Sequence, residues 1–204
     1  VAPYAESKVR VEGDLVDLAD ADFVPVSLRN ATAFGFSPRL RADIVLNNLV
    51  GHAILSNTIK VLSDGTPWRP LVHARDIAGA VVAALAAPAD VVRGEAFNVG
   101  STDNNVQVSD IASEVKKVVP EAELLVTGET GGDPRSYRVD FTKIGKLLPD
   151  FRAGWSVADG AAELAQAYRT HGLTQEAFDR RFTRLAVLAD RQAAGTLDAT
   201  LRPA

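Results

Sequence analysis

The chain has 204 residues, of which 47% are hydrophobic and 24% charged, and its formal net charge is −4. This composition is typical of a folded globular domain, and the negative charge argues against a surface that binds nucleic-acid phosphates or an anionic membrane. The absence of cysteine excludes disulfides, thiolate zinc sites and a cysteine nucleophile, and it favours a cytoplasmic location. Its three histidines are widely spaced, so no metal site is expected.

Alternating helix and strand patterns along the chain predict an α/β fold. In chain order we expect a helix over 5–18, a strand over 23–29, a loop over 35–41, a helix over 43–55, strands over 59–62 and 71–72, a helix over 76–87, a strand over 96–99, a helix over 109–119, a strand over 123–126, a loop over 127–134, and helices over 156–172 and from 175. The longest apolar stretch, 77–89, is broken by glycine and proline and is too short to span a bilayer.

Helix ends and apolar faces follow from particular residue types. Short polar side chains make good helix N-caps, so we expect Asp76 and Ser109 to cap their helices and residues 156–159 to form a capping box. In the first helix Val9, Leu15 and Val16 are expected to face a core. Along the last helix a stripe of apolar side chains at helical spacing predicts core packing or a subunit contact; the residues are Phe178, Phe182, Leu185 and Ala189.

The first segment with possible chemistry is the pair Tyr4 and Lys8. A spacing of four residues places both side chains on one helix face, where an ammonium group favours the ionised form of a phenol. Such a pair can work as a general acid and base. Taken alone, the pattern is common enough that an exposed tyrosine on an ordinary helix is the better interpretation.

Further segments change that interpretation. The segments are PYAESK at 3–8, LRNATAFG at 28–35, DGTPWRPLVHARD at 64–76 and FNVG at 97–100. In this order they resemble the catalytic helix, the following strand, the substrate-domain signature and the next strand of the extended short-chain dehydrogenase/reductases. Within that superfamily the likeness is greatest to NAD-dependent epimerases and dehydratases of nucleotide-sugars.

The resemblance implies the C-terminal part of an extended Rossmann-type, doubly wound fold, together with a small α/β substrate-binding domain. Residues 1–35 would supply the catalytic helix and a strand of the Rossmann domain. Residues 36–204 would mainly form the substrate domain with its C-terminal helices, while strands around 71–100 return to the Rossmann sheet. The sequence has no Gly-rich pyrophosphate loop after a strand, so we expect it to be the C-terminal portion of a longer enzyme, inactive by itself.

For the site, the resemblance implies Tyr4 as general acid/base, Lys8 as its partner and a ligand of the nicotinamide ribose, and Ala31 beside the nicotinamide. The substrate contacts would include Thr32, where many relatives have asparagine. The others would be Asn48 or its neighbour Asn47, Arg69 as a clamp on the diphosphate, and Arg135 near a second phosphate-binding arginine. One departure is Thr130, because the hexose epimerases usually have an arginine three residues before the acidic position.

The expected cofactor is therefore NAD, with NADP also allowed, and the expected partner is a nucleoside-diphosphate sugar bound by a homodimer. Two other functions stay open. One is a reductase of non-sugar carbonyls, which needs no phosphate-clamping arginine, so Arg69 and the Asn47–Asn48 pair argue against it. The other is a non-catalytic nucleotide-binding protein on the same scaffold, against which the intact Tyr4 and Lys8 argue. His73 is expected to make a structural hydrogen bond, and Arg39 and Arg41 fit either a substrate contact or a solvated loop.

Overall fold

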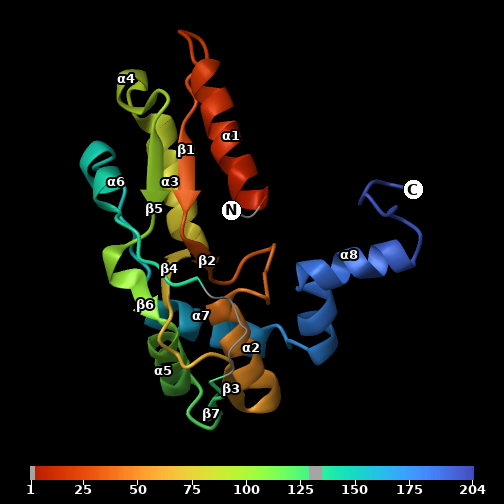
Figure 1. The fold of residues 1–204 in the computed structure, drawn as a ribbon. Helices are drawn as coiled ribbons and strands as arrows, with labels where there is room; N and C mark the ends of the chain where they lie inside the picture. Colours follow the sequence, from red (N-terminus) through yellow and green to blue (C-terminus); the bar gives the residue numbers. More distant parts are fainter. Residues whose placement is uncertain (1–2, 129–134) are drawn as a thin grey trace.

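Helices and strands alternate along most of the chain and give an α/β fold (Figure 1). The computed structural model describes residues 3–128 and 135–204. Within these residues no helix is both long and apolar enough to cross a membrane. The elements in chain order are α1 (Pro3–Asp17), β1 (Ser27–Asn30), β2 (Thr32–Phe34), α2 (Val45–Ser56), β3 (Thr58–Val61), β4 (Trp68–His73), α3 (Ala74–Ala86), α4 (Ala89–Val92), β5 (Ala96–Val99), the 3-10 helix η1 (Thr102–Asn104), β6 (Asn105–Gln107), α5 (Val108–Val118), β7 (Glu123–Val126), α6 (Thr142–Leu147), α7 (Val157–Thr170), the π-helix η2 (Ala177–Arg181) and α8 (Arg184–Ala193).

Strand pairing in the described residues is mainly parallel. The pairs β1–β5, β2–β4 and β3–β7 are parallel, and β6 runs antiparallel to β4. In the first pair Ser27 lies opposite Ala96 and Asn30 opposite Val99, so the carboxyl ends of β1 and β5 lie at one edge. The strands expected over 96–99 and 123–126 are confirmed, whereas the strand expected over 23–29 begins only at Ser27.

Two hydrophobic cores lie on either side of β4. One core packs α2, α5 and α7 against β3, and the other packs α3, α6, β1 and β5. β4 serves both, because successive side chains of a strand point to opposite faces: Leu71 belongs to the first core and Val72 to the second. In Figure 1 the second core lies in the part that holds α3, β5 and α6, and the first in the part that holds α2, α5 and α7. A domain division at 35/36 stays a prediction.

The helix α1 buries none of its residues, a property that it shares with α8. Val9 and Val16, which were expected to face a core, are 70% and 50% exposed, and Leu15 is only partly buried. Described residues cover this apolar face only in part. An ion pair between Glu12 and Arg29 of β1 fastens α1 to the strand, and this hydrogen bond lowers the pKa of Glu12.

The structure corrects two predicted N-caps. α3 is capped by His73, whose ring Nδ1 accepts from the Arg75 amide at 3.1 Å, because Asp76 instead accepts from the backbone amides of Gly154 and Trp155 at 3.0 and 3.2 Å. Similarly, Gln107 rather than Ser109 is the N-cap of α5.

The capping box over residues 156–159 is confirmed. Ser156 Oγ accepts from the Asp159 amide, and the Asp159 carboxylate accepts from the Ser156 amide, each at 3.1 Å. The pKa of Asp159 is lowered by the hydroxyl of Ser156, which donates to its carboxylate at 2.5 Å, and by the Ser156 amide. The capping box fixes the start of α7.

The prediction of a single C-terminal helix from residue 175 is wrong. The chain forms the π-helix η2, breaks at Phe182, and resumes as α8, which lies away from the two cores in Figure 1. Phe178 is buried because it packs against α2 where Gly51 has no side chain; a Cβ there would lie 2.1 Å from its ring. Leu185, by contrast, is 75% exposed. The predicted apolar stripe therefore divides into a core anchor and an exposed surface.

Candidate active site

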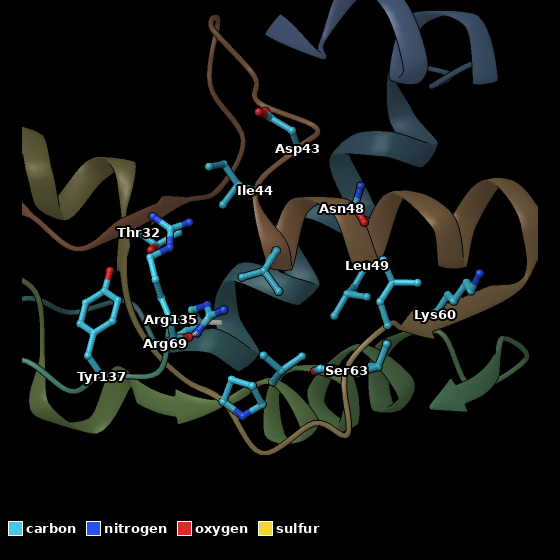
Figure 2. A pocket seen from close by; sticks show the side chains of 15 residues that line it. Thr32, Asp43, Ile44, Asn48, Leu49, Lys60, Ser63, Arg69, Arg135 and Tyr137 are labelled. Carbon is cyan, nitrogen blue, oxygen red and sulfur yellow. Dashed lines mark hydrogen bonds between the residues drawn. The ribbon is translucent and has the colours of Figure 1, made fainter. Parts of the chain in front are cut away.

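A cavity of about 420 Å³, called the main cavity below, opens between α2, β3 and β4 (Figure 2). Parts of the chain far apart in sequence form its walls, including β2, the start of α2, β3 and its following turn, β4, and the segment at 135–137. The lining residues are Thr32, Asp43, Ile44, Val45, Asn48, Leu49, Lys60, Val61, Leu62, Ser63, Pro67, Arg69, Val108, Arg135 and Tyr137.

The structure brings most of the predicted substrate contacts together in this cavity. Thr32 enters from β2, Asn48 from α2, Arg69 from β4 and Arg135 from the segment at 135–137. The two arginines lie next to each other in Figure 2. Residues 129–134, which include Thr130, lie outside the described residues.

Asn47 faces elsewhere. Its side chain is almost fully buried, and its Oδ1 accepts from the Gly35 amide at 3.1 Å while its Nδ2 donates to the Arg41 carbonyl at 3.0 Å. Tyr168 donates its hydroxyl to the Asn47 carbonyl at 3.2 Å, and burial raises the pKa of this tyrosine, which keeps it a neutral donor. Asn47 thus fastens the loop between β2 and α2, and of the two neighbouring asparagines only Asn48 lines the cavity.

Hydrogen bonds join the two segments that carry the cavity arginines. Arg69 donates from Nη1 to the Trp68 carbonyl at 3.0 Å and to the Arg135 carbonyl. The hydroxyl of Ser136 accepts from the Trp68 amide at 3.1 Å, so residues 135–136 are fastened along the edge of β4. Two guanidinium groups in one cavity form a planar, permanently charged donor set that suits phosphate or carboxylate oxygens.

Sequence reasoning did not identify several polar residues of this cavity. Lys60 and Ser63 come from β3 and its turn, and Tyr137, which is 45% exposed, follows the arginine segment. Asp43 supplies the acidic group of the lining, and Arg41 holds it through hydrogen bonds of 2.7 and 2.6 Å that lower its pKa. No local motif marks these residues, because they reach the cavity only through the packing of β3 and the 135–138 segment.

His73 takes the structural role expected for it. It is fully buried, its Nδ1 accepts from the backbone, and its Nε2 lies 2.8 Å from Glu163 Oε2. Trp155 stacks on the imidazole with ring centroids 4.1 Å apart. The same Glu163 oxygen accepts from the Phe36 amide at 3.0 Å. The pair therefore ties α7 and β4 to the loop that follows β2, which leads into the wall of the main cavity.

The second part of the predicted site, α1, runs antiparallel to β1. Val16 lies against Gly94, whose amide donates to the Pro25 carbonyl just before β1 at 2.9 Å. Further toward the N-terminus of the helix, Glu12 accepts from Arg29 near the carboxyl end of the strand at 2.9 Å. Moving toward the start of α1 therefore means moving toward the carboxyl edge of β1 and β5.

From this direction we expect Tyr4 to lie near the level of Ala31. A helix rises about 1.5 Å per residue, so Tyr4 lies about 18 Å along α1 from Val16, and a strand rises about 3.3 Å per residue, so Ala31 lies about 20 Å from Pro25. Tyr4 is 73% exposed, and Lys8 Nζ lies 5.4 Å from the centroid of its ring, so both point to one side of the helix. A phenol and an ammonium thus stand at the edge where parallel α/β sheets bind ligands.

No group of three or more potential ligands among His, Asp and Glu comes together in residues 3–128 and 135–204 in a way that would hold a metal ion.

Comparison with known proteins shows which family and which solved structures this chain resembles. The model of the NAD dependent epimerase/dehydratase family matches residues 1–100. The chain is similar to a UDP-glucuronic acid 4-epimerase from Bacillus cereus, solved with UDP-glucuronic acid and NAD, at 25% identity over 72% of this chain and 45% of that one, with a TM-score of 0.61. It is also similar to a UDP-N-acetylglucosamine 4-epimerase from Bacillus cereus (23% identity, 81% and 56% covered, TM-score 0.67) and to a dTDP-glucose 4,6-dehydratase from Bacillus anthracis (17% identity, 91% and 55% covered, TM-score 0.67).

The chain spans about half the length of these solved structures. The likenesses below 25% identity concern the fold alone and agree with the parallel pairing of the strands described above. The matched range holds Tyr4, Lys8, Ala31, Thr32 and both asparagines, together with the arginine of β4. Over residues 1–100, just under half of its length, the chain therefore matches the NAD dependent epimerase/dehydratase family.

Proposed function

We propose that this chain provides the acid–base helix and the substrate cavity of an NAD-dependent epimerase or dehydratase of nucleoside-diphosphate sugars. One observation carries the proposal: Thr32, Asn48, Arg69 and Arg135, which lie far apart in the sequence and were each expected to contact such a substrate, line one cavity. The exposed apolar face of α1 supports a homodimer as part of the proposal.

Among the described residues that line the main cavity, the positive groups outnumber the acidic one. Arg69, Arg135 and Lys60 line it, and the carboxylate of Asp43 is held by Arg41. A diphosphate would accept hydrogen bonds from the guanidinium groups, and Asn48 and Ser63 would supply neutral donors and acceptors for the nucleoside or the sugar. This donor set favours a nucleotide-sugar over a neutral carbonyl compound, the substrate of the alternative reductase, which offers nothing to pair with two arginines.

The residues at the carboxyl edge fit the nicotinamide end of NAD. Ala31 is a small, partly buried side chain that allows a flat ring to approach, and Lys8 can donate to a ribose hydroxyl. NAD, when bound, supplies the acceptor and later the donor of hydride at the sugar carbon.

In the initial oxidation Tyr4 would take the proton of the sugar hydroxyl. In an epimerase it would later return a proton to the same oxygen, whereas in a dehydratase that oxygen stays a carbonyl oxygen while water is lost from the sugar. Lys8, whose ammonium lies toward the Tyr4 ring, would stabilise the phenolate between the two steps. Epimerases and dehydratases share the initial oxidation, so the same pair serves both. The exposed position of Tyr4 leaves it accessible to a substrate, which also argues against a non-catalytic protein.

The test is Arg69→Ala in the intact protein, with calorimetric titration of UDP-glucuronic acid, UDP-N-acetylglucosamine, dTDP-glucose and NAD. A charge-assisted hydrogen bond contributes about 1.5–3 kcal/mol, so we expect the affinity for the nucleotide-sugar to fall by one to two decades while the affinity for NAD is unchanged. The matched control is Arg169→Ala, an exposed arginine of α7 that pairs with Glu121 outside the cavity. Wild-type affinity for every nucleotide-sugar in Arg69→Ala would overturn the proposal.

A further inference from the structure

Four arginines line a second, smaller cavity of about 240 Å³ beside the main cavity. Arg39 and Arg41 come from the loop between β2 and α2, whereas Arg181 and Arg184 come from the end of η2 and the start of α8. A backbone hydrogen bond of 2.9 Å from the Ala42 amide to the Phe182 carbonyl holds the two segments together. We call this cavity the arginine pocket; none of the described residues that line it is acidic.

Most of the positive charge of the pocket is not neutralised by the protein. Arg41 is paired with Asp43, but Arg39, Arg181 and Arg184 have no carboxylate within 4.0 Å among residues 3–128 and 135–204. Four guanidinium charges less the charge of Asp43 leave a local charge of +3, in a chain whose net charge is −4. Like charges held close together repel, so this arrangement destabilises the free protein unless an anion binds there.

We propose that the arginine pocket binds a small polyanion that carries phosphoryl groups, at a site separate from the main cavity. The planar donor fork of arginine matches pairs of phosphoryl oxygens, and several forks facing one hollow match an ion with several such pairs. A single carboxylate would neutralise only one of the three unpaired charges. The small volume also suits a phosphate or a pyrophosphate group better than an extended polymer.

The pocket shares a wall with the main cavity through one ion pair. Asp43 lines the main cavity, whereas its partner Arg41 lines the arginine pocket. A polyanion that accepts hydrogen bonds from Arg41 would compete with Asp43 for the guanidinium group. Binding at the two sites would therefore be linked, and the linkage would be reciprocal.

The experiment is a calorimetric titration of the intact protein with pyrophosphate, and with acetate at matched ionic strength. Arg69→Gln serves as the background in which binding at the main cavity is weakened. In this background we expect pyrophosphate still to bind, with an affinity that falls as salt is added, and acetate not to bind. The double variant Arg181→Gln/Arg184→Gln should bind pyrophosphate at least about tenfold more weakly, because it loses two charged donors.

The matched control is Arg191→Gln, an exposed arginine in the last turn of α8 that does not line the pocket, and it should leave pyrophosphate binding unchanged. Thermal melts establish that each variant is folded; if the double variant is not, Arg39→Gln in the exposed loop takes its place. Complete loss of pyrophosphate binding in Arg69→Gln alone would overturn the proposal. So would an equal loss in Arg191→Gln, since general charge attraction would then account for the binding.

Discussion

The main cavity and the helix α1 carry the two halves of the predicted chemistry, and the protein supports them in opposite ways. Residues from β2, α2, β3, β4 and the 135–137 segment wall the cavity, and a buried core lies behind it. α1 buries none of its residues, and its ion pair to β1 involves groups that are partly exposed. The positions of the cavity side chains are therefore fixed by packing, whereas the position of Tyr4 depends on a helix held at few points.

From this difference we predict that mutation can separate substrate binding from the acid–base chemistry. A change in the cavity or in the buried network behind it should alter substrate affinity or stability. A change on the exposed face of α1 should alter turnover and leave the folded structure intact, because surface substitutions away from special features usually change stability by no more than about 0.5 kcal/mol.

The largest expected effect sharpens this separation. In the intact enzyme, Tyr4→Phe removes only the hydroxyl, and general acid–base catalysis contributes about 10²–10⁴ in rate. We therefore expect kcat to fall by that factor while the Kd values for nucleotide-sugar and NAD change little. Tyr137→Phe, the same substitution at a tyrosine of the main cavity, is the matched control and should keep most of the turnover. If Tyr4→Phe retained more than about half of kcat, Tyr4 would not be the acid–base group.

The next largest effect concerns stability and the buried residues behind the main cavity. Gly35 has φ of +104°, and a Cβ there would lie 2.1 Å from His73 Nε2. Gly35→Ala combines backbone strain with overpacking against the His73–Glu163 pair, so we expect it to lower the free energy of unfolding by roughly 2–4 kcal/mol. Urea denaturation measures this loss. Gly145→Ala in α6, where a Cβ meets nothing within 4 Å, should be neutral or slightly stabilising.

Much of the fold follows from the sequence, because periodic apolar patterns and turn residues act locally. β5, β7 and the capping box of α7 were predictable for this reason. The N-cap of α3 was not predictable, because the carboxylate of Asp76 accepts instead from the backbone amides of residues 154 and 155. These amides belong to a segment that is distant in the sequence. The break between η2 and α8 was not predictable either. Phe178 packs against Gly51 of α2, and no local sequence pattern indicates this contact.

The candidate site divides along the same line. Arg69 was identified because it belongs to a motif whose order along the chain is recognisable. Lys60 and Tyr137 were missed because only tertiary packing carries β3 and the 135–138 segment to the cavity. The sequence alone could not tell whether Asn47 or Asn48 lines the cavity, because the two residues are identical neighbours. The direction of each side chain on α2 distinguishes them.

The difference between these asparagines gives a third prediction, in which one substitution mainly affects stability and the other mainly affects binding. Asn47→Ala leaves buried backbone groups of Gly35 and Arg41 without their partner, so we expect a loss of about 1–3 kcal/mol in stability by urea denaturation. Asn48→Ala removes one hydrogen bond to Ala42 at the rim of the cavity, and we expect it to weaken nucleotide-sugar binding several-fold with a smaller loss of stability. The reverse pattern would make Asn47 the ligand-contacting residue.

The smallest expected effect is a pH dependence at the ion pair between the two cavities. The hydrogen bonds from Arg41, with a smaller contribution from the charge of Arg184, hold the pKa of Asp43 below its usual value of 3.8. A carboxyl whose pKa is lowered by folding stabilises the protein fully above its unfolded pKa, and this contribution is lost as the pH falls through the lower folded value. Because the pair is partly exposed, we expect no more than about 1 kcal/mol. Urea denaturation of wild type and Arg41→Gln should differ by this amount at pH 7, and the difference should shrink below about pH 4. A difference that stays constant down to the acid transition would mean that Arg41 acts by packing its aliphatic stem rather than by its charge on Asp43.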